Sequence, residues 1–177
     1  SIVSAAFTVR EVVRLGRYAL GRSERRVEAA IAAMELDGVA ERPYPALSVG
    51  QQQRVAMARA LAQLPERGVL ILDEPTSAMD MRHARNAFSV LRRLTDEGTT
   101  VLIAMHDLPA AASIADDAWL LAGGLPGRLA DAGPVGQVMR EDRLEGVFGV
   151  GFEWTQRADG SRVLLPETRV EANSGRM

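Results

Sequence analysis

Cysteine and lysine are both absent from this sequence of 177 residues, and each absence excludes a kind of chemistry. Without cysteine the chain forms no disulfide, no thiolate metal site and no thiol nucleophile. Without lysine, all 21 basic residues are arginines. The phosphate-binding loop G-x-x-x-x-G-K-[ST] needs its lysine to reach the β- and γ-phosphates. These residues therefore hold no such loop in any register.

Long apolar runs and clustered positive charge are lacking as well. No apolar stretch approaches the ~18 residues that a membrane-spanning helix needs, so we expect that the chain does not insert in a membrane by itself. Charged residues make up 25% of the chain and the net charge is −2, so no nucleic-acid partner is expected. Hydrophobic residues, at 47%, suffice for one packed core.

The sequence predicts helices in the first part of the chain, up to about residue 64. Apolar residues recur at helical spacing over residues 8–19, and Ser23 is expected to cap a second helix that Gly38 ends. A third helix is expected to begin at Ser48 and to run to about residue 64. Gln51, three positions after Ser48, fits a capping box at its start.

The start of the third helix is a candidate anion site. Its unpaired N–H groups and positive dipole end favour phosphate, Ser48 adds a hydroxyl, and Gly50 lets an anion approach the backbone closely. A plain helix cap is the simpler alternative. A further alternative is the G-x-S-x-G nucleophile elbow of α/β-hydrolases, which residues 46–50 loosely resemble, with His106 as base. That elbow needs a strand directly before the serine, and none is predicted.

A strand–helix–strand unit is predicted next. Residues 69–72 form a continuous apolar run, as expected of a parallel strand buried on both faces. A long helix over about residues 81–97 leads to a second buried strand at residues 99–105, a length that suits a βαβ unit. A terminal hairpin is expected to turn at Asp159–Gly160.

Polar side chains follow both predicted strands. Asp73 and Glu74 end the first strand, and His106 follows the second. Because ligands bind at the carboxyl ends of parallel strands, we expect these side chains to lie close together. An aspartate suits Mg²⁺, a neighbouring carboxylate can deprotonate an attacking water, and a histidine can hydrogen-bond a phosphate. A plain loop start and a structural histidine are the alternatives.

The order of these motifs resembles the nucleotide-binding domain of ABC transporters. It comprises the signature LSVGQQQR at residues 47–54, a Walker B strand ending in Asp-Glu-Pro at residues 73–75, a D-loop at residues 77–80 and Met-His-Asp at residues 105–107. The resemblance spans about residues 8–165. It implies an α/β fold, in which part of the RecA-like parallel sheet of P-loop NTPases lies beside a helical signature subdomain.

By this resemblance the chain is one partial ABC ATPase domain. Residues 1–64 would form the helical signature subdomain, residues 65–166 the C-terminal part of the RecA-like core, and residues 167–177 a flexible tail. The Walker A phosphate loop comes before these elements in the family, and the Q-loop glutamine is expected just before Ser1. Two positions depart from the family pattern: Val49 replaces the first glycine of the signature, and Met79 replaces the usual leucine of the D-loop.

The resemblance also implies ATP and Mg²⁺ as ligands and assigns roles to residues. Glu74 would be the general base, His106 the switch histidine, and Asp73 would serve Mg²⁺. Further residues would bind nucleotide from the partner subunit's side or lie at the dimer interface: Ser48, Gly50, Gln51 and Asp80.

The implied function is that of an ATP-hydrolysing transporter subunit, peripheral on the cytoplasmic face of the cell membrane. Its partners would be a second ATPase subunit and transmembrane permease subunits. Residues 7–18 and 147–166 resemble importers for iron chelates, haem or vitamin B12. One alternative is a truncated, non-catalytic module that lends its signature face to a complete ATPase. Another is a soluble ABC ATPase of translation or DNA repair, which usually carries long insertions or tandem domains.

We predict that the 177-residue chain alone does not bind ATP tightly, because the lysine of the phosphate loop is missing. Isothermal titration calorimetry of the isolated chain with Mg-ATP tests this prediction. A dissociation constant of about 1 μM or lower would contradict it.

Overall fold

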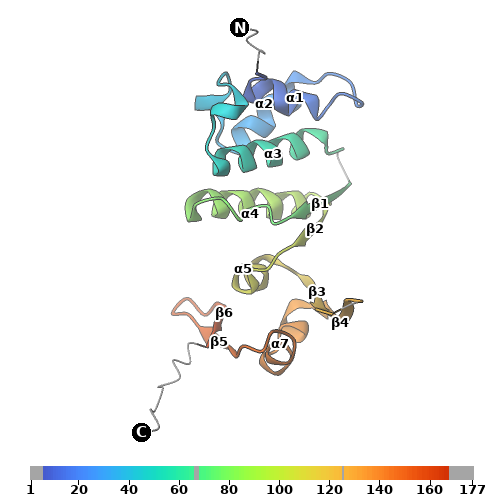
Figure 1. Cartoon of the computed structure of the whole chain (residues 1–177), viewed down its shortest axis with the longest axis vertical. Coiled ribbons are helices and arrows are strands. Elements are labelled where there is room, and N and C mark those ends of the chain that lie inside the picture. Colours follow the sequence, from blue (N-terminus) through green and yellow to red (C-terminus); the bar gives the residue numbers. More distant parts are fainter. Residues whose placement is uncertain (1–5, 66–67, 125, 168–177) are drawn as a thin grey trace. The chain divides into compact units, whose positions relative to one another are not determined.

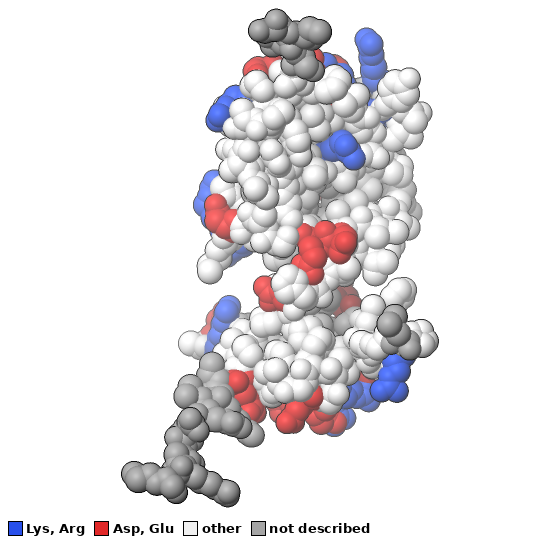
Figure 2. Space-filling model, in the orientation of Figure 1, with Lys and Arg blue, Asp and Glu red and all other residues white. Residues whose placement is uncertain are grey.

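The computed structural model of the chain (Figure 1) describes residues 6–65, 68–124 and 126–167. The chain forms two units, residues 1–104 and 105–177. The expected subdomain boundary at residue 64 lies inside the first unit, and the expected tail lies outside the described residues after residue 167. None of the described helices is long and apolar enough to cross a membrane. Charged side chains form small separate groups on the face drawn in Figure 2.

Three α-helices and two short 3-10 helices make up residues 6–65, the described N-terminal part of the first unit. Each α-helix buries one apolar face, as the helical spacing predicts. These faces meet in one core, in which Val13, Ile31 and Val55 are 0% exposed. The elements are α1 (Val9–Leu15), α2 (Glu24–Ala33), η1 (Asp37–Val39), η2 (Tyr44–Ala46) and α3 (Val49–Gln63).

The end of α2 differs from the prediction. The helix ends at Ala33, and Glu35 rather than Gly38 takes the left-handed conformation, with φ 52°. A residue other than glycine rarely adopts this conformation. The carbonyl of Glu35 accepts a hydrogen bond of 2.9 Å from Arg54 Nη1 on α3. The predicted glycine cap is therefore wrong, because a contact from a distant helix holds Glu35 in this conformation.

Two parallel strands joined by a long helix follow α3. β1 (Val69–Asp73) pairs in parallel with β2 (Thr100–Ala104), and α4 (Met81–Asp96) connects them. The predicted βαβ unit is confirmed. α4 adds three buried side chains to the core that it shares with α3: Ala87, Val90 and Leu91.

One face of the β1–β2 pair is open in the described part of the chain. Val69 is 64% exposed, Ile71 is 71% exposed and Leu102 is 41% exposed, whereas Leu70 on the other face is 6% exposed. The predicted burial on both faces is therefore wrong for these residues. Apolar side chains of a strand are buried only where another element covers them, and α4 and its neighbours cover one face.

Two antiparallel hairpins and three helices form the second unit as far as its residues are described. The hairpin of β5 and β6 is the one predicted around Asp159–Gly160. Leu144 and Leu164, both 0% exposed, lie in a separate core. The elements are α5 (Leu108–Ile114), β3 (Asp117–Ala122), β4 (Arg128–Pro134), α6 (Val135–Val138), α7 (Glu141–Phe148), β5 (Phe152–Gln156) and β6 (Arg162–Pro166).

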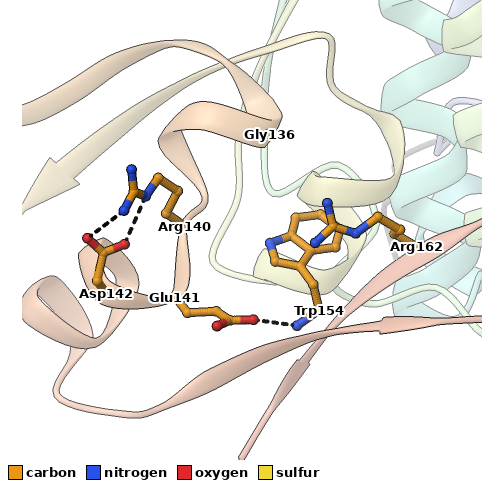
Figure 3. A pocket seen from close by; sticks show the side chains of 6 residues that line it. All are labelled: Gly136, Arg140, Glu141, Asp142, Trp154 and Arg162. Carbon is orange, nitrogen blue, oxygen red and sulfur yellow. Dashed lines mark hydrogen bonds and ion pairs between the residues drawn. The ribbon is translucent and has the colours of Figure 1, made fainter.

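Trp154 lines a cavity of about 450 Å³ in the second unit (Figure 3). Its backbone N–H donates to the Glu141 carboxylate at 2.9 Å, and the Arg162 guanidinium lies 4.9 Å from the ring centroid. Arg140 pairs with Asp142 at 3.0 Å. The polar groups around this cavity thus bind one another, which indicates a structural role.

Replacing the buried Ile31 with alanine is expected to lower the free energy of unfolding of this chain by about 2–5 kcal/mol, because it leaves a cavity in the core. The matched control Ile71→Ala removes the same atoms from the open face of the sheet and should change stability by less than about 1 kcal/mol. Urea unfolding followed by far-UV circular dichroism measures both. Equal losses would mean that the open face is covered in solution.

Candidate functional site

The signature turn at the start of α3 is built as the sequence predicts. The N–H of Gln51 donates to the Ser48 hydroxyl at 3.3 Å, and the N–H of Ser48 donates to the Gln51 side-chain oxygen at 3.0 Å. This reciprocal pair confirms the capping box. Ser48 is exposed, and so is Val49, at 70%. The turn therefore presents its serine and the substituted valine to solvent.

Gly50 brings the signature turn against the D-loop. A Cβ atom added at Gly50 would lie 2.5 Å from the carbonyl oxygen of Ala78, which is far inside normal contact. The sequence suggested that glycine here lets an anion approach. The structure gives a further reason, since no other residue lets the backbones of α3 and the D-loop come this close.

Gln53 adds hydrogen bonds to this contact. Its amide nitrogen donates to the carbonyl of Glu74 at 2.7 Å and to the hydroxyl of Ser77 at 3.0 Å. Its amide oxygen accepts the N–H of Ala78 at 2.8 Å. Sequence reasoning missed this residue, because a third glutamine in a polar run gives no sign of the chain segment that it will meet.

Asp73 and Glu74 lie at the carboxyl end of β1, as predicted. Asp73 is the last residue paired with β2, opposite Ala104. Glu74 donates its N–H to the carbonyl of Ala104 at 3.0 Å and has φ 45°, a left-handed conformation. Residues held in such sparsely populated conformations cluster at functional sites.

Asp73 fits the donor chemistry of a magnesium site that is completed by substrate. The described residues contain no group of three or more histidine, aspartate or glutamate side chains that could hold a metal ion alone. Mg²⁺ commonly takes one or two carboxylates and completes its shell with phosphate oxygens and water. The exposed carboxylate of Asp73 at the strand end suits such a site.

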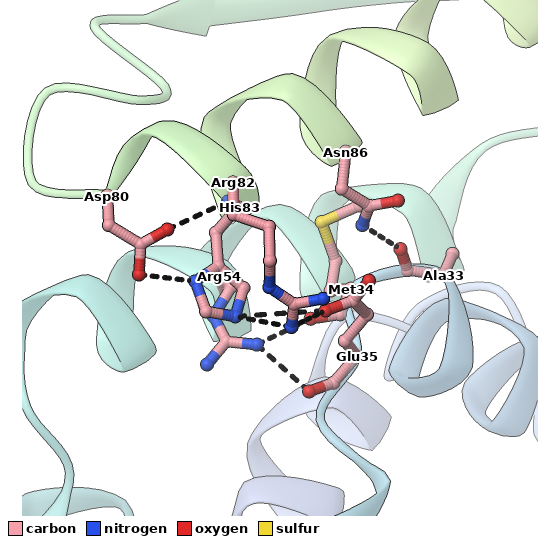
Figure 4. A network of polar contacts seen from close by, with 8 residues as sticks. All are labelled: Ala33, Met34, Glu35, Arg54, Asp80, Arg82, His83 and Asn86. Atoms are coloured by element: carbon pink, nitrogen blue, oxygen red, sulfur yellow. Dashed lines mark hydrogen bonds and ion pairs between the residues drawn. The ribbon is translucent and has the colours of Figure 1, made fainter.

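Asp80 caps α4 and connects it to a polar network (Figure 4). One carboxylate oxygen accepts the N–H of His83 at 2.9 Å, and the other lies 2.7 Å from His83 Nδ1. The hydrogen bond from the backbone of His83 is the main cause that lowers the pKa of Asp80. The resemblance places Asp80 at the nucleotide interface, and here its carboxylate binds its own helix.

The same network holds the end of α2 against α4. Arg82 Nη2 lies 2.6 Å from the Glu35 carboxylate. Arg54, which is 8% exposed, donates to the carbonyls of Met34 and Glu35 at 2.9 Å each (Figure 4). Burial lowers the pKa of Arg54. The arginine of the signature motif is thus a buried structural residue.

His106 belongs to the second unit. It is exposed and directly precedes Asp107, the residue that caps α5 through the N–H of Ala110 at 3.0 Å. Its expected proximity to Asp73 and Glu74 stays a prediction.

The hydrolase alternative for Ser48 is contradicted by the local fold. Residues Tyr44–Ala46 form the 3-10 helix η2, and no strand leads into Ser48. The nucleophile elbow of α/β-hydrolases requires a strand immediately before its serine. Ser48 is therefore a helix cap and not an elbow nucleophile.

Comparison with known proteins defines the class of this chain. Residues 3–77 match the model of the family described as ABC transporter. The hemin import ATP-binding protein HmuV of Rhizobium johnstonii is 36% identical over an alignment of 182 positions that covers 96% of this chain and 68% of that protein. The chain belongs to the ABC transporter family, which confirms the resemblance read from its motifs.

Within this family the chain is similar to further hemin import ATP-binding proteins. HmuV of Rhodopseudomonas palustris (strain BisB18) is 39% identical over an alignment of 173 positions that covers 93% of this chain and 63% of that protein. The chain spans 57% of HmuV of Rhodococcus jostii (strain RHA1), at 37% identity. It therefore corresponds to about three fifths of these curated relatives.

Solved structures confirm the α/β fold. A putative metal-chelate type ABC transporter in an inward-facing conformation matches with a TM-score of 0.73 and 23% identity, over 94% of this chain and 70% of that chain. A bacterial Atm1-family ABC exporter with ATP bound matches with a TM-score of 0.63 and 31% identity, over 78% of this chain and 25% of that chain.

Gly50→Ala is expected to lower the free energy of unfolding by about 1–3 kcal/mol, because the new methyl group meets the carbonyl of Ala78. The control Gly38→Ala adds the same atom where nothing lies within 4 Å, and it should stay within about 0.5 kcal/mol of the parent or exceed it. Urea unfolding followed by circular dichroism compares the two variants. A Gly50→Ala variant as stable as Gly38→Ala would show that α3 and the D-loop are not in contact.

Proposed function

We propose that this chain carries the signature, Walker B and D-loop elements of an ATP-hydrolysing subunit of an ABC importer. The observation that supports this most is the position of the signature turn. α3 packs against the segment that begins at Glu74, through the close approach of Gly50 to Ala78 and the hydrogen bonds of Gln53. One rigid unit would thus carry both a phosphate-facing turn and a candidate base.

Hydrolysis by such a site follows from the residues at the end of β1. Glu74 would take a proton from a water molecule as the water oxygen attacks the γ-phosphorus of ATP and the bond to the bridging oxygen of ADP breaks. Asp73 would hold Mg²⁺, which supplies positive charge to the phosphates when bound. His106 would hydrogen-bond the γ-phosphate.

A second ATPase subunit would complete each site. Ser48, Gly50 and Gln51 would face the γ-phosphate of an ATP bound mainly by the partner, because the start of a helix favours phosphate and Ser48 adds a hydroxyl there. Val49, which is exposed beside them, would also face the partner. In this arrangement Asp80 would stay at the dimer interface while it caps α4.

Transmembrane permease subunits are the further partners in this proposal, which places the protein peripherally at the cytoplasmic face of the membrane. A hollow of about 350 Å³ on the first unit, which apolar side chains line together with Glu11, Arg14, Arg17 and Arg22, supports a docking surface. It includes Phe7, Leu15 and Tyr18, which are 57%, 46% and 90% exposed. The cargo would be haem or a related iron chelate, because several similar proteins are named as hemin import proteins.

A non-catalytic module is the second candidate function. Residues 1–177 contain no lysine and so supply no phosphate loop, and such a module would use the loop of its partner. Such a module would lend Ser48 and its neighbours to a complete ATPase and would hydrolyse nothing itself.

In the full-length ATPase subunit, Glu74→Gln is expected to lower kcat for ATP hydrolysis by about 10²–10⁴-fold, because the amide cannot accept the proton of water. ATP binding should remain. The matched control Glu97→Gln changes an exposed glutamate just after α4 and should leave kcat unchanged. Steady-state phosphate release measures both variants. Full activity of Glu74→Gln would remove this residue as the base, and an inactive parent subunit would favour the non-catalytic module.

A further inference from the structure

Both the nitrogen and the oxygen of the Gln53 side-chain amide form hydrogen bonds to the segment from Glu74 to Ala78. Its nitrogen donates to the carbonyl of Glu74 and to the hydroxyl of Ser77, and its oxygen accepts the N–H of Ala78. A flipped amide would place oxygen against the carbonyl of Glu74 and nitrogen against the N–H of Ala78. The network therefore allows only one orientation of this amide.

The carbonyl that Gln53 holds belongs to a residue in an unfavourable backbone conformation. Glu74 has φ 45°, and its carbonyl also accepts the hydroxyl of Ser77 at 3.1 Å and the N–H of Ser77 at 3.3 Å. Such a conformation persists only where surrounding contacts impose it. The bond that Gln53 donates to this carbonyl and the bond that the Glu74 N–H donates to Ala104 on β2 come from outside the turn itself.

The helix that carries Gln53 is fixed as well. Gln53 lies on α3, one turn after Gly50, and at Gly50 the helix approaches the carbonyl of Ala78 too closely for a side chain at that position. Arg54, the next residue, is buried and bonded to the end of α2. The helix that presents Gln53 is thus held on both sides, so a shift of the signature turn must move the segment from Glu74 to Ala78.

We propose that Gln53 is a positioning residue for hydrolysis. It fixes the backbone of Glu74 from the signature helix, and so it links the turn that faces the partner's nucleotide to the base that serves the chain's own nucleotide. This inference rests on the proposed ATPase function. It adds a role to those of Ser48 and Glu74, because the side chain of Gln53 on α3 bonds directly to the segment from Glu74 to Ala78.

The test uses Gln53→Met in the full-length subunit, since methionine keeps the length of the side chain and removes all three hydrogen bonds. We expect kcat for ATP hydrolysis to fall by about 10- to 100-fold, because small displacements of a catalytic group cost this much. KM for ATP should stay within about twofold of the parent, because the phosphate loop is unchanged. Gln63→Met, at the exposed end of the same helix, is the matched control and should match the parent in both constants.

Hydrogen exchange supplies a second readout in the same proteins. The peptide that contains Ala78 should exchange at least about tenfold faster in Gln53→Met, because its N–H loses the acceptor on Gln53. Peptides from α1 and α2 should exchange at parental rates, which shows that the variant is folded.

The outcomes separate this inference from the proposed function. One outcome is that the parent hydrolyses ATP and Glu74→Gln abolishes this hydrolysis. If Gln53→Met then keeps full kcat, the positioning role is wrong and the ATPase function stands. An equal loss in Gln63→Met, or a loss confined to KM, also overturns the positioning role. If the parent has no activity, the proposed function itself fails.

Discussion

The close approach of α3 to the segment after β1 is the constraint on which the first unit depends. At Gly50 the two backbones meet so closely that a methyl group would collide with Ala78. One turn later, Gln53 donates a hydrogen bond to the carbonyl of Glu74 and accepts one from the N–H of Ala78. Glycine and glutamine thus perform complementary tasks, since one removes bulk and the other satisfies polar groups.

A second set of contacts gives α3 its fixed place. Arg54 is buried and donates to carbonyls at the end of α2, where Glu35 occupies a left-handed conformation that glycine would normally take. Arg82 on α4 pairs with the carboxylate of Glu35. A buried charge is tolerated because carbonyl groups replace its hydration. The signature helix is thereby held to α2 and α4 as well as to the D-loop.

The sequence predicted the features that follow from local rules. The capping box of Ser48 and Gln51 depends on residues three apart, and the βαβ unit depends on apolar patterning and length, so both were readable in advance. The roles of Gln53 and Glu35 depend on partners about 20 residues away, which no local pattern encodes.

The open face of β1 shows a different limit of sequence reasoning. Val69 and Ile71 have the composition of a doubly buried strand, yet both are largely exposed here. The apolar composition of a strand shows only that the strand can be buried. Whether it is buried depends on the elements that lie beside it.

The central claim is that the signature turn of one subunit acts on nucleotide held by another while Gln53 holds the base of its own subunit. A crystal structure of the full-length Glu74→Gln subunit with Mg-ATP tests it most directly. The account predicts a dimer in which the hydroxyl of Ser48 and the N–H of Gly50 bind the γ-phosphate of the partner's ATP, with Gln53 still bonded to residue 74. A γ-phosphate that no residue of the 48–51 turn approaches would contradict it.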